Sequence, residues 1–186
     1  MNQIKEFSEE RFKLWYMKRE YCKSGRTTLP GREQLLDEFE HYHASGKGLS
    51  QFYPRNWSIV VLSQPEFENL IHLESGWTNQ AGLTVNGQSR RLIEIATRAK
   101  ACGYWENPDK RHLDYYEKFK TNSLVLSGLN RIVIRNVTIG EGKNDSSALF
   151  YLHDGNGRGL AYIRALKKLK VEYHPVEAIY ADTTRK

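Results

Sequence analysis

The chain has 186 residues, of which 39% are hydrophobic and 12% are aromatic, and its net charge at pH 7 is +6. A chain of this length allows one domain, or one domain with an appendage, and a sizeable core. No stretch approaches the roughly 18 apolar residues of a membrane span. Residues 1–6 lack the apolar segment of a secretory signal, so we expect a cytoplasmic protein without a membrane partner. Cys22 and Cys102 lack metal-ligand spacing and are expected to be free thiols.

The first part of the chain is predicted to be helical. Apolar residues recur at helical spacing over 8–21 and 31–44, and Ser8 is placed to cap the first of these helices. A glycine-containing stretch ends the second helix. Residues 1–56 are therefore predicted to form a helical cap that packs on the rest of the chain.

Residues 57–186 are predicted to form an α/β core. Strand-like segments, apolar or β-branched, are expected at 57–62, 123–126, 131–137, 148–153 and 175–180. Helical spacing predicts helices over 65–73, 89–101, 109–120 and 157–169, the first three within a helical insertion at about 64–120. The predicted fold class is thus mixed α/β (α+β), a small mixed sheet with a helical N-terminal part.

A glycine turn connects the predicted strand at 148–153 to the predicted helix at 157–169. It reads Asp154-Gly155-Asn156-Gly157-Arg158. Glycines permit positive φ and leave room for an oxyanion, and the first N–H groups of a helix bind anions. Gly155, Asn156, Gly157 and Arg158 are therefore predicted to hold phosphate, and Asp154 to bind a divalent metal or take a hydroxyl proton. A tight turn in which Asp154 or Asn156 only caps the helix is the alternative.

Basic residues are concentrated around this turn. Residues 131–170 contain eight Lys or Arg against three acids. Such an excess favours an anionic ligand such as a nucleotide, a phosphometabolite or nucleic acid. A solvated helix face is the alternative explanation for the cluster at 167–170.

Two further residues are candidates for chemistry at the turn. His153 adjoins the turn and is placed to relay a proton or contact the ligand. Glu141, in the polar loop at 140–147, is placed to fold over the site as a second carboxylate. By contrast, His112 lies on a polar predicted helix and is expected to be solvated.

The turn and its flanks resemble the ParB/sulfiredoxin superfamily. The resemblance covers roughly residues 123–182, with a strand that ends in the turn, a helix with small residues on its inner side, and a short strand at Pro175-Val176. It implies that the turn and helix N-terminus bind nucleotide phosphates, as in partition proteins that hydrolyse CTP and in free serine kinases. Asp154, Gly155 and Arg158 match the Asp-Gly-His-x-Arg turn of those kinases, with Asn156 at the histidine position. Sulfiredoxin's catalytic cysteine has no counterpart, and a helix-turn-helix DNA domain has no obvious place after residue 182.

The same five residues also resemble the signature of Fic-type AMP transferases. That signature needs a histidine four residues before the acid and a second arginine further on. Phe150 and Ala161 occupy those positions here. A Fic-like nucleotidyl transferase is therefore the weakest of the alternatives.

These features together predict a nucleotide-dependent enzyme, either a phosphotransferase (kinase) or a hydrolase of nucleoside triphosphates. The expected ligands are a nucleoside di- or triphosphate, Mg²⁺ held by Asp154, and a small-molecule acceptor. A nucleic-acid-binding protein or ParB-like nuclease is the alternative, because the basic residues would also grip a polynucleotide.

Overall fold

The computed structural model describes residues 1–44, 56–72, 78, 80–84, 90–121, 132–136 and 150–182. The described strands are β1 (Asn2–Glu6), β2 (Asn56–Leu62), β3 (Ile71–His72), β4 (Arg90–Arg91), β5 (Ile132–Asn136), β6 (Phe150–Asp154) and β7 (Val176–Asp182). The described helices are α1 (Glu9–Lys23), α2 (Arg32–Ala44), α3 (Gln64–Glu68), α5 (Leu92–Ala101), α6 (Lys110–Thr121) and α7 (Asn156–Leu169), with a 3₁₀ turn η2 (Tyr104–Glu106). None of these helices is long and apolar enough to cross a membrane.

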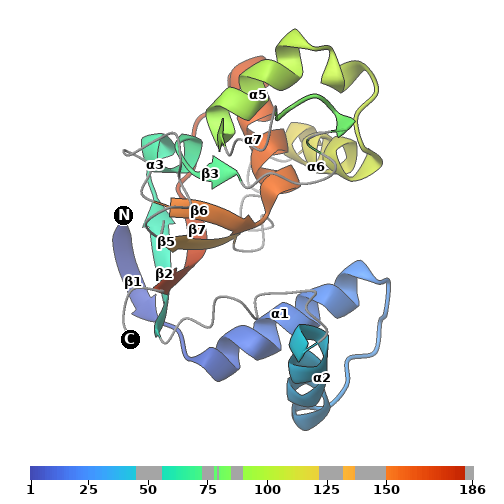
Figure 1. The fold of residues 1–186 in the computed structure, drawn as a ribbon, viewed down its shortest axis with the longest axis vertical. Helices are drawn as coiled ribbons and strands as arrows, with labels where there is room; N and C mark the ends of the chain where they lie inside the picture. Colours follow the sequence, from blue (N-terminus) through green and yellow to red (C-terminus); the bar gives the residue numbers. More distant parts are fainter. Residues whose placement is uncertain are drawn as a thin grey trace.

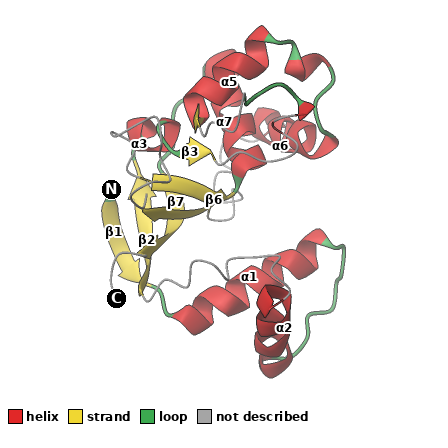
Figure 2. Cartoon of the chain, in the orientation of Figure 1, coloured by secondary structure: helices red, strands yellow, loops and turns green. Residues whose placement is uncertain are grey.

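Within these residues, seven strands form one mixed sheet in the order β1-β2-β7-β5-β6-β3-β4. β2 pairs antiparallel with β1 and β7, and β5 pairs parallel with β7 but antiparallel with β6. β6 and β7 therefore lie on either side of β5, and the chain passes through α7 between them (Figure 1; Figure 2). The prediction of a mixed α/β fold is confirmed.

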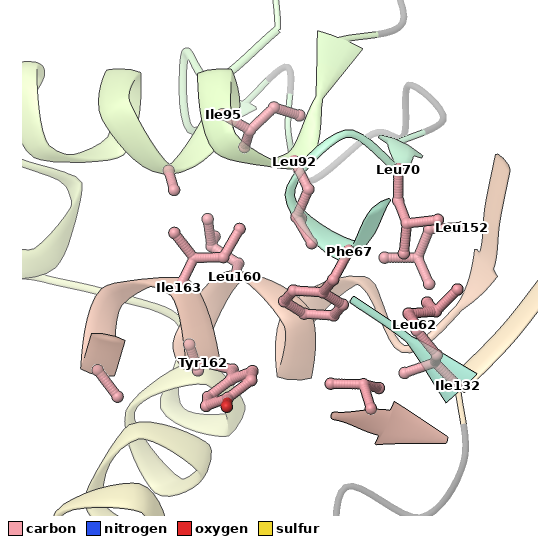
Figure 3. Packing of buried hydrophobic residues seen from close by; sticks show 14 of the residues in the cluster. Leu62, Phe67, Leu70, Leu92, Ile95, Ile132, Leu152, Leu160, Tyr162 and Ile163 are labelled. Carbon is pink, nitrogen blue, oxygen red and sulfur yellow. The ribbon is translucent and has the colours of Figure 1, made fainter. Parts of the chain in front are cut away.

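Helices cover both faces of the sheet, so the protein has two apolar cores. One core joins β2, β5, β6 and β7 to α3, α5, α6 and α7, with Leu62, Ile132 and Leu152 on the sheet side (Figure 3). The other joins the opposite face of the sheet to α1 and α2, through Trp57 and Val133. Neighbouring residues in a strand point to opposite faces. Because both faces are covered, the central strands carry apolar runs such as Ile132-Val133-Ile134 in place of a strict polar–apolar alternation.

Aromatic stacking fixes the N-terminal helices on the sheet. Phe12 of α1 stacks on Trp57 of β2 with ring centroids 3.8 Å apart, and Phe39 of α2 meets Phe12 edge-on at 6.1 Å. The backbone N–H of Arg11 donates to the Ser8 hydroxyl at 3.3 Å, as expected of an N-cap. The N-terminal helices therefore pack directly on the sheet that carries the glycine turn.

Two local differences from the predicted elements have simple causes. β1 was not predicted, because all five of its residues are exposed and carry no apolar alternation. α3 ends at Glu68 rather than continuing to 73, since Ile71 and His72 pair with β4 and β6 instead. The predicted strand at 123–126 lies outside the described residues.

Candidate functional site

The glycine turn stands where β6 ends and α7 begins. Gly155 has φ of 104°, a left-handed conformation, and acts as the N-cap of α7 without a side-chain hydrogen bond. The first helical bond runs from the N–H of Gly159 to the carbonyl of Gly155 at 2.8 Å. The N–H groups of Asn156 and Gly157 precede that bond, as at any helix start, and nothing among the described residues caps them.

Both glycines of the turn are packed tightly. A Cβ on Gly155 would stand 2.6 Å from Cγ2 of Ile132, and a Cβ on Gly157 would stand 2.4 Å from Nε2 of His112. No side chain fits at either position without movement of its neighbour. The turn is therefore a rigid structure with the His112 ring placed directly against it.

Asp154 accepts hydrogen bonds from two arginines at this point. Nη1 of Arg19, from α1, lies 2.5 Å from Oδ2 of Asp154, and Nη2 of Arg158, from α7, lies 2.8 Å from the same oxygen. The two arginine side chains are only 6% and 8% exposed. Because α1 and α7 cover opposite faces of the sheet, this carboxylate ties the two helical layers together.

The two arginines are compensated unequally. Burial lowers the pKa of Arg19, but the charges of Asp154 and Glu20 outweigh burial and the net shift is upward. Burial also lowers the pKa of Arg158. The attraction of Asp154 is smaller than this effect, so the net shift of the Arg158 pKa is downward. Two buried guanidinium groups thus share one carboxylate oxygen, and a further anion near Arg158 would be stabilised.

His112 lies at the same turn, where the sequence predicted a solvated side chain. It is 5% exposed, and its Nδ1 lies 2.7 Å from the hydroxyl of Tyr104. That hydroxyl also accepts the N–H of Asp109 at 3.2 Å. The other ring nitrogen, Nε2, faces Gly157, and in the tautomer with the proton on Nε2 it would be an N–H donor at the turn.

The burial of His112 predicts that the protein becomes less stable at acidic pH. Burial lowers the pKa of His112 below its ordinary 6.5. We therefore expect the free energy of unfolding to hold its full value above pH 6.5 and to fall as the pH falls through 6.5 towards the folded-state pKa, because the unfolded chain takes up the proton first. Denaturant unfolding of the protein and of His112→Phe, across about pH 5 to 8, measures this loss.

The matched control is His41→Gln. His41 is exposed, and its hydrogen bond to the backbone carbonyl of Asp37 raises its pKa, which gives the opposite sign. The slope below pH 6.5 should flatten in His112→Phe and persist in His41→Gln. An unchanged slope in His112→Phe would show that this ring does not titrate as its burial requires.

Asn156, in the turn, has a buried side-chain oxygen. Its Oδ1 is buried and has no hydrogen-bond partner among the described residues. A buried polar group without a hydrogen-bond partner lowers the free energy of unfolding by roughly 1–3 kcal/mol. Rotation of the amide presents its N–H₂ group instead, so a bound phosphate oxygen would satisfy this side chain.

The structure gathers some of the predicted site residues and separates others. Asp154 to Arg158 form one compact turn, but the Arg158 guanidinium turns back to Asp154. His153 is half-buried on β6, and strand alternation directs it to the face opposite Asp154. Glu141 lies outside the described residues.

Metal-binding capacity at the turn depends on Asp154. Among the described residues, no cluster of three or more His, Cys, Asp or Glu side chains could hold a metal ion by itself. Mg²⁺ is commonly held by one or two carboxylates together with substrate phosphates. Asp154 would hold Mg²⁺ only together with the phosphates of a nucleotide, and its Oδ2 already accepts from two arginines.

Comparison with known proteins adds nothing to this geometry. No family model, curated protein or solved structure matches the chain. The resemblance to the ParB/sulfiredoxin superfamily stays a prediction, and the function rests on the chemistry of the turn.

Proposed function

We propose that the protein is a nucleotide-dependent enzyme, a phosphotransferase or a nucleoside triphosphate hydrolase, which binds phosphates at the first turn of α7. The observation that supports this most is the donor set at Gly155–Gly157. The N–H groups of Asn156 and Gly157 precede the first bond of a 14-residue helix, Oδ1 of Asn156 is buried without a partner among the described residues, and Nε2 of His112 faces Gly157. The positive end of the helix dipole adds to their attraction for an anion.

Arg158 and Arg19 add positive charge next to the turn, at Asp154. Their guanidinium groups are buried, and they share a single carboxylate oxygen. A phosphate group at the first turn of α7 would complete the compensation of Arg158, whose pKa is lowered by burial. Catalysis in such a site consists mainly of positioning and of neutralising the charge that develops on the phosphoryl oxygens.

Asp154 then has a positioning role. Its Oδ2 accepts from two guanidinium groups, which fixes the carboxylate and engages the lone pairs of that oxygen. The two positive charges lower the basicity of the carboxylate, which disfavours removal of a proton from the acceptor. In this proposal Oδ1 is the atom that would hold Mg²⁺, which would neutralise charge on the phosphates. The proposal leaves the proton transfer to Glu141, because strand alternation directs His153 to the face opposite Asp154.

Calorimetry with a panel of nucleoside di- and triphosphates, with and without Mg²⁺, tests the proposal. Asn156→Asp replaces the amide by a carboxylate of nearly the same shape. We expect it to weaken nucleotide binding by about tenfold or more, because it places a negative charge where phosphate binds. Asn2→Asp, on the exposed edge strand β1, makes the same charge change away from the turn and should leave binding intact.

Phosphate release from the bound nucleotide, or its transfer to added small-molecule alcohols, then identifies the reaction. Binding to none of the nucleotides under either condition would overturn the proposal. So would equal binding by the protein and by Asn156→Asp.

A further inference from the structure

A groove between α5, η2 and α7 combines an apolar wall with basic side chains. Its volume is about 560 Å³, within the range of pockets that bind small ligands. Ala99 and Trp105 line its apolar part, and the single acid in its lining is Glu106. Four basic side chains line it as well, namely Lys100, Arg164, Lys167 and Lys168.

Arg164 packs against two aromatic rings of the groove wall. Its guanidinium carbon lies 4.1 Å from the ring centroid of Trp105 and 4.0 Å from that of Tyr116. Its Nη1 is buried and has no hydrogen-bond partner among the described residues. The two ring centroids lie 6.3 Å apart, so the rings flank the guanidinium on adjacent sides and restrict its movement. An anion that reaches Nη1 would give this group the hydrogen bond that it lacks among the described residues.

The lysines add charge that the described fold does not neutralise. Nζ of Lys167 donates to the hydroxyl of Thr97 on α5 at 3.2 Å, which orients this lysine towards the groove. Among the described residues, no carboxylate lies within ion-pair distance of the four basic groups. Like charges placed this close repel one another, so an anion in the groove lowers the energy of the whole cluster.

We infer that this groove is a second binding site, for a ligand that carries closely spaced phosphate groups. Phosphate groups of this kind come from a free polyphosphate compound or from the backbone of a single-stranded nucleic acid. None of the groove residues belongs to the first turn of α7, so the inference does not depend on the proposed function. It also accounts for the basic cluster at 167–170, which the nucleotide site leaves without a role.

The test follows the indole N–H resonance of Trp105 by NMR, assigned with Trp105→Phe, during titration with sodium tripolyphosphate and, separately, with a short oligothymidylate. Trp105 lines the groove, but its ring also contacts Tyr104, the hydrogen-bond partner of His112 at the turn, so the titration is repeated with Asn156→Asp. We expect the double variant Lys167→Ala/Lys168→Ala to weaken binding by about tenfold to a hundredfold, because two charge-assisted contacts are lost. The control Lys5→Ala/Lys18→Ala removes the same charge from exposed positions on β1 and α1 and should change binding little.

Each outcome bears on the inference. If the groove variant weakens the binding of both probes, the site binds a nucleic-acid backbone, and the affinity for the oligonucleotide should fall steeply with salt. If the variant weakens the binding of tripolyphosphate alone, the ligand is a small polyphosphate. If neither probe shifts the Trp105 resonance, or if both double variants weaken binding equally, the inference is wrong. Asn156→Asp should leave this signal unchanged, which separates it from a failure of the nucleotide site.

Discussion

Replacement of Asp154 by alanine is expected to lower the free energy of unfolding by about 3–5 kcal/mol, the usual cost of removing one partner from a buried ion pair. The reason is specific to this turn. Arg19 and Arg158 are both buried, and both donate to the same oxygen of Asp154. Without it, two guanidinium groups are left close together in a poorly solvated place. Denaturant unfolding monitored by circular dichroism measures the change.

A surface aspartate provides the control for this prediction. Asp37 is exposed, and its ion-pair partner among the described residues is the exposed His41, so Asp37→Ala should change stability by no more than about 0.5 kcal/mol. A double-mutant cycle with Arg19→Met shows whether the loss comes from the ion pair itself. If Asp154→Ala costs no more than Asp37→Ala, the carboxylate does not join the two helical layers as described.

Gly155→Ala is expected to cost about 2–5 kcal/mol. The left-handed conformation accounts for roughly 1–2 kcal/mol of this cost, and the close approach of the new Cβ to Ile132 accounts for about 1–3 kcal/mol more. Both features are present here, since φ is 104° and the Cβ would stand 2.6 Å from Cγ2 of Ile132. Thermal or denaturant unfolding of the variant measures the total.

Gly82→Ala separates the two contributions. Gly82 also has positive φ, at 66°, but a Cβ there meets nothing within 4 Å. We expect Gly82→Ala to show the conformational cost alone, about 1–2 kcal/mol. The excess in Gly155→Ala then measures how tightly the turn packs on β5. Equal costs for the two variants would mean that β5 yields readily and that the turn is not rigid.

Sequence patterns predicted the central elements well, because buried strands contain runs of apolar residues. The apolar run at 57–62 became β2, and the run before Asp154 became β6. β1 could not be predicted in this way. It is held by backbone pairing with β2 and buries none of its own side chains, so apolar periodicity has nothing to detect.

Part of the candidate site could also be predicted from a local sequence pattern. Asp154 to Arg158 are consecutive, and glycine spacing marks a turn whatever surrounds it. Arg19 and His112 were missed, since their roles depend on long-range packing. Arg19 is 135 residues from Asp154 in sequence. A polar helix that contains a histidine gives no sign that the ring will be buried against a glycine.

The most direct measurement of the central idea is a ¹H–¹⁵N titration of the protein with a nucleoside triphosphate and Mg²⁺. If phosphate binds at the first turn of α7, the backbone amide resonances of Asn156 and Gly157 should shift most, and Asn156→Asp should suppress those shifts. If a nucleotide binds while these two amides stay unperturbed, or if no resonance moves at saturating nucleotide, the turn is a structural connection and the proposed function is wrong.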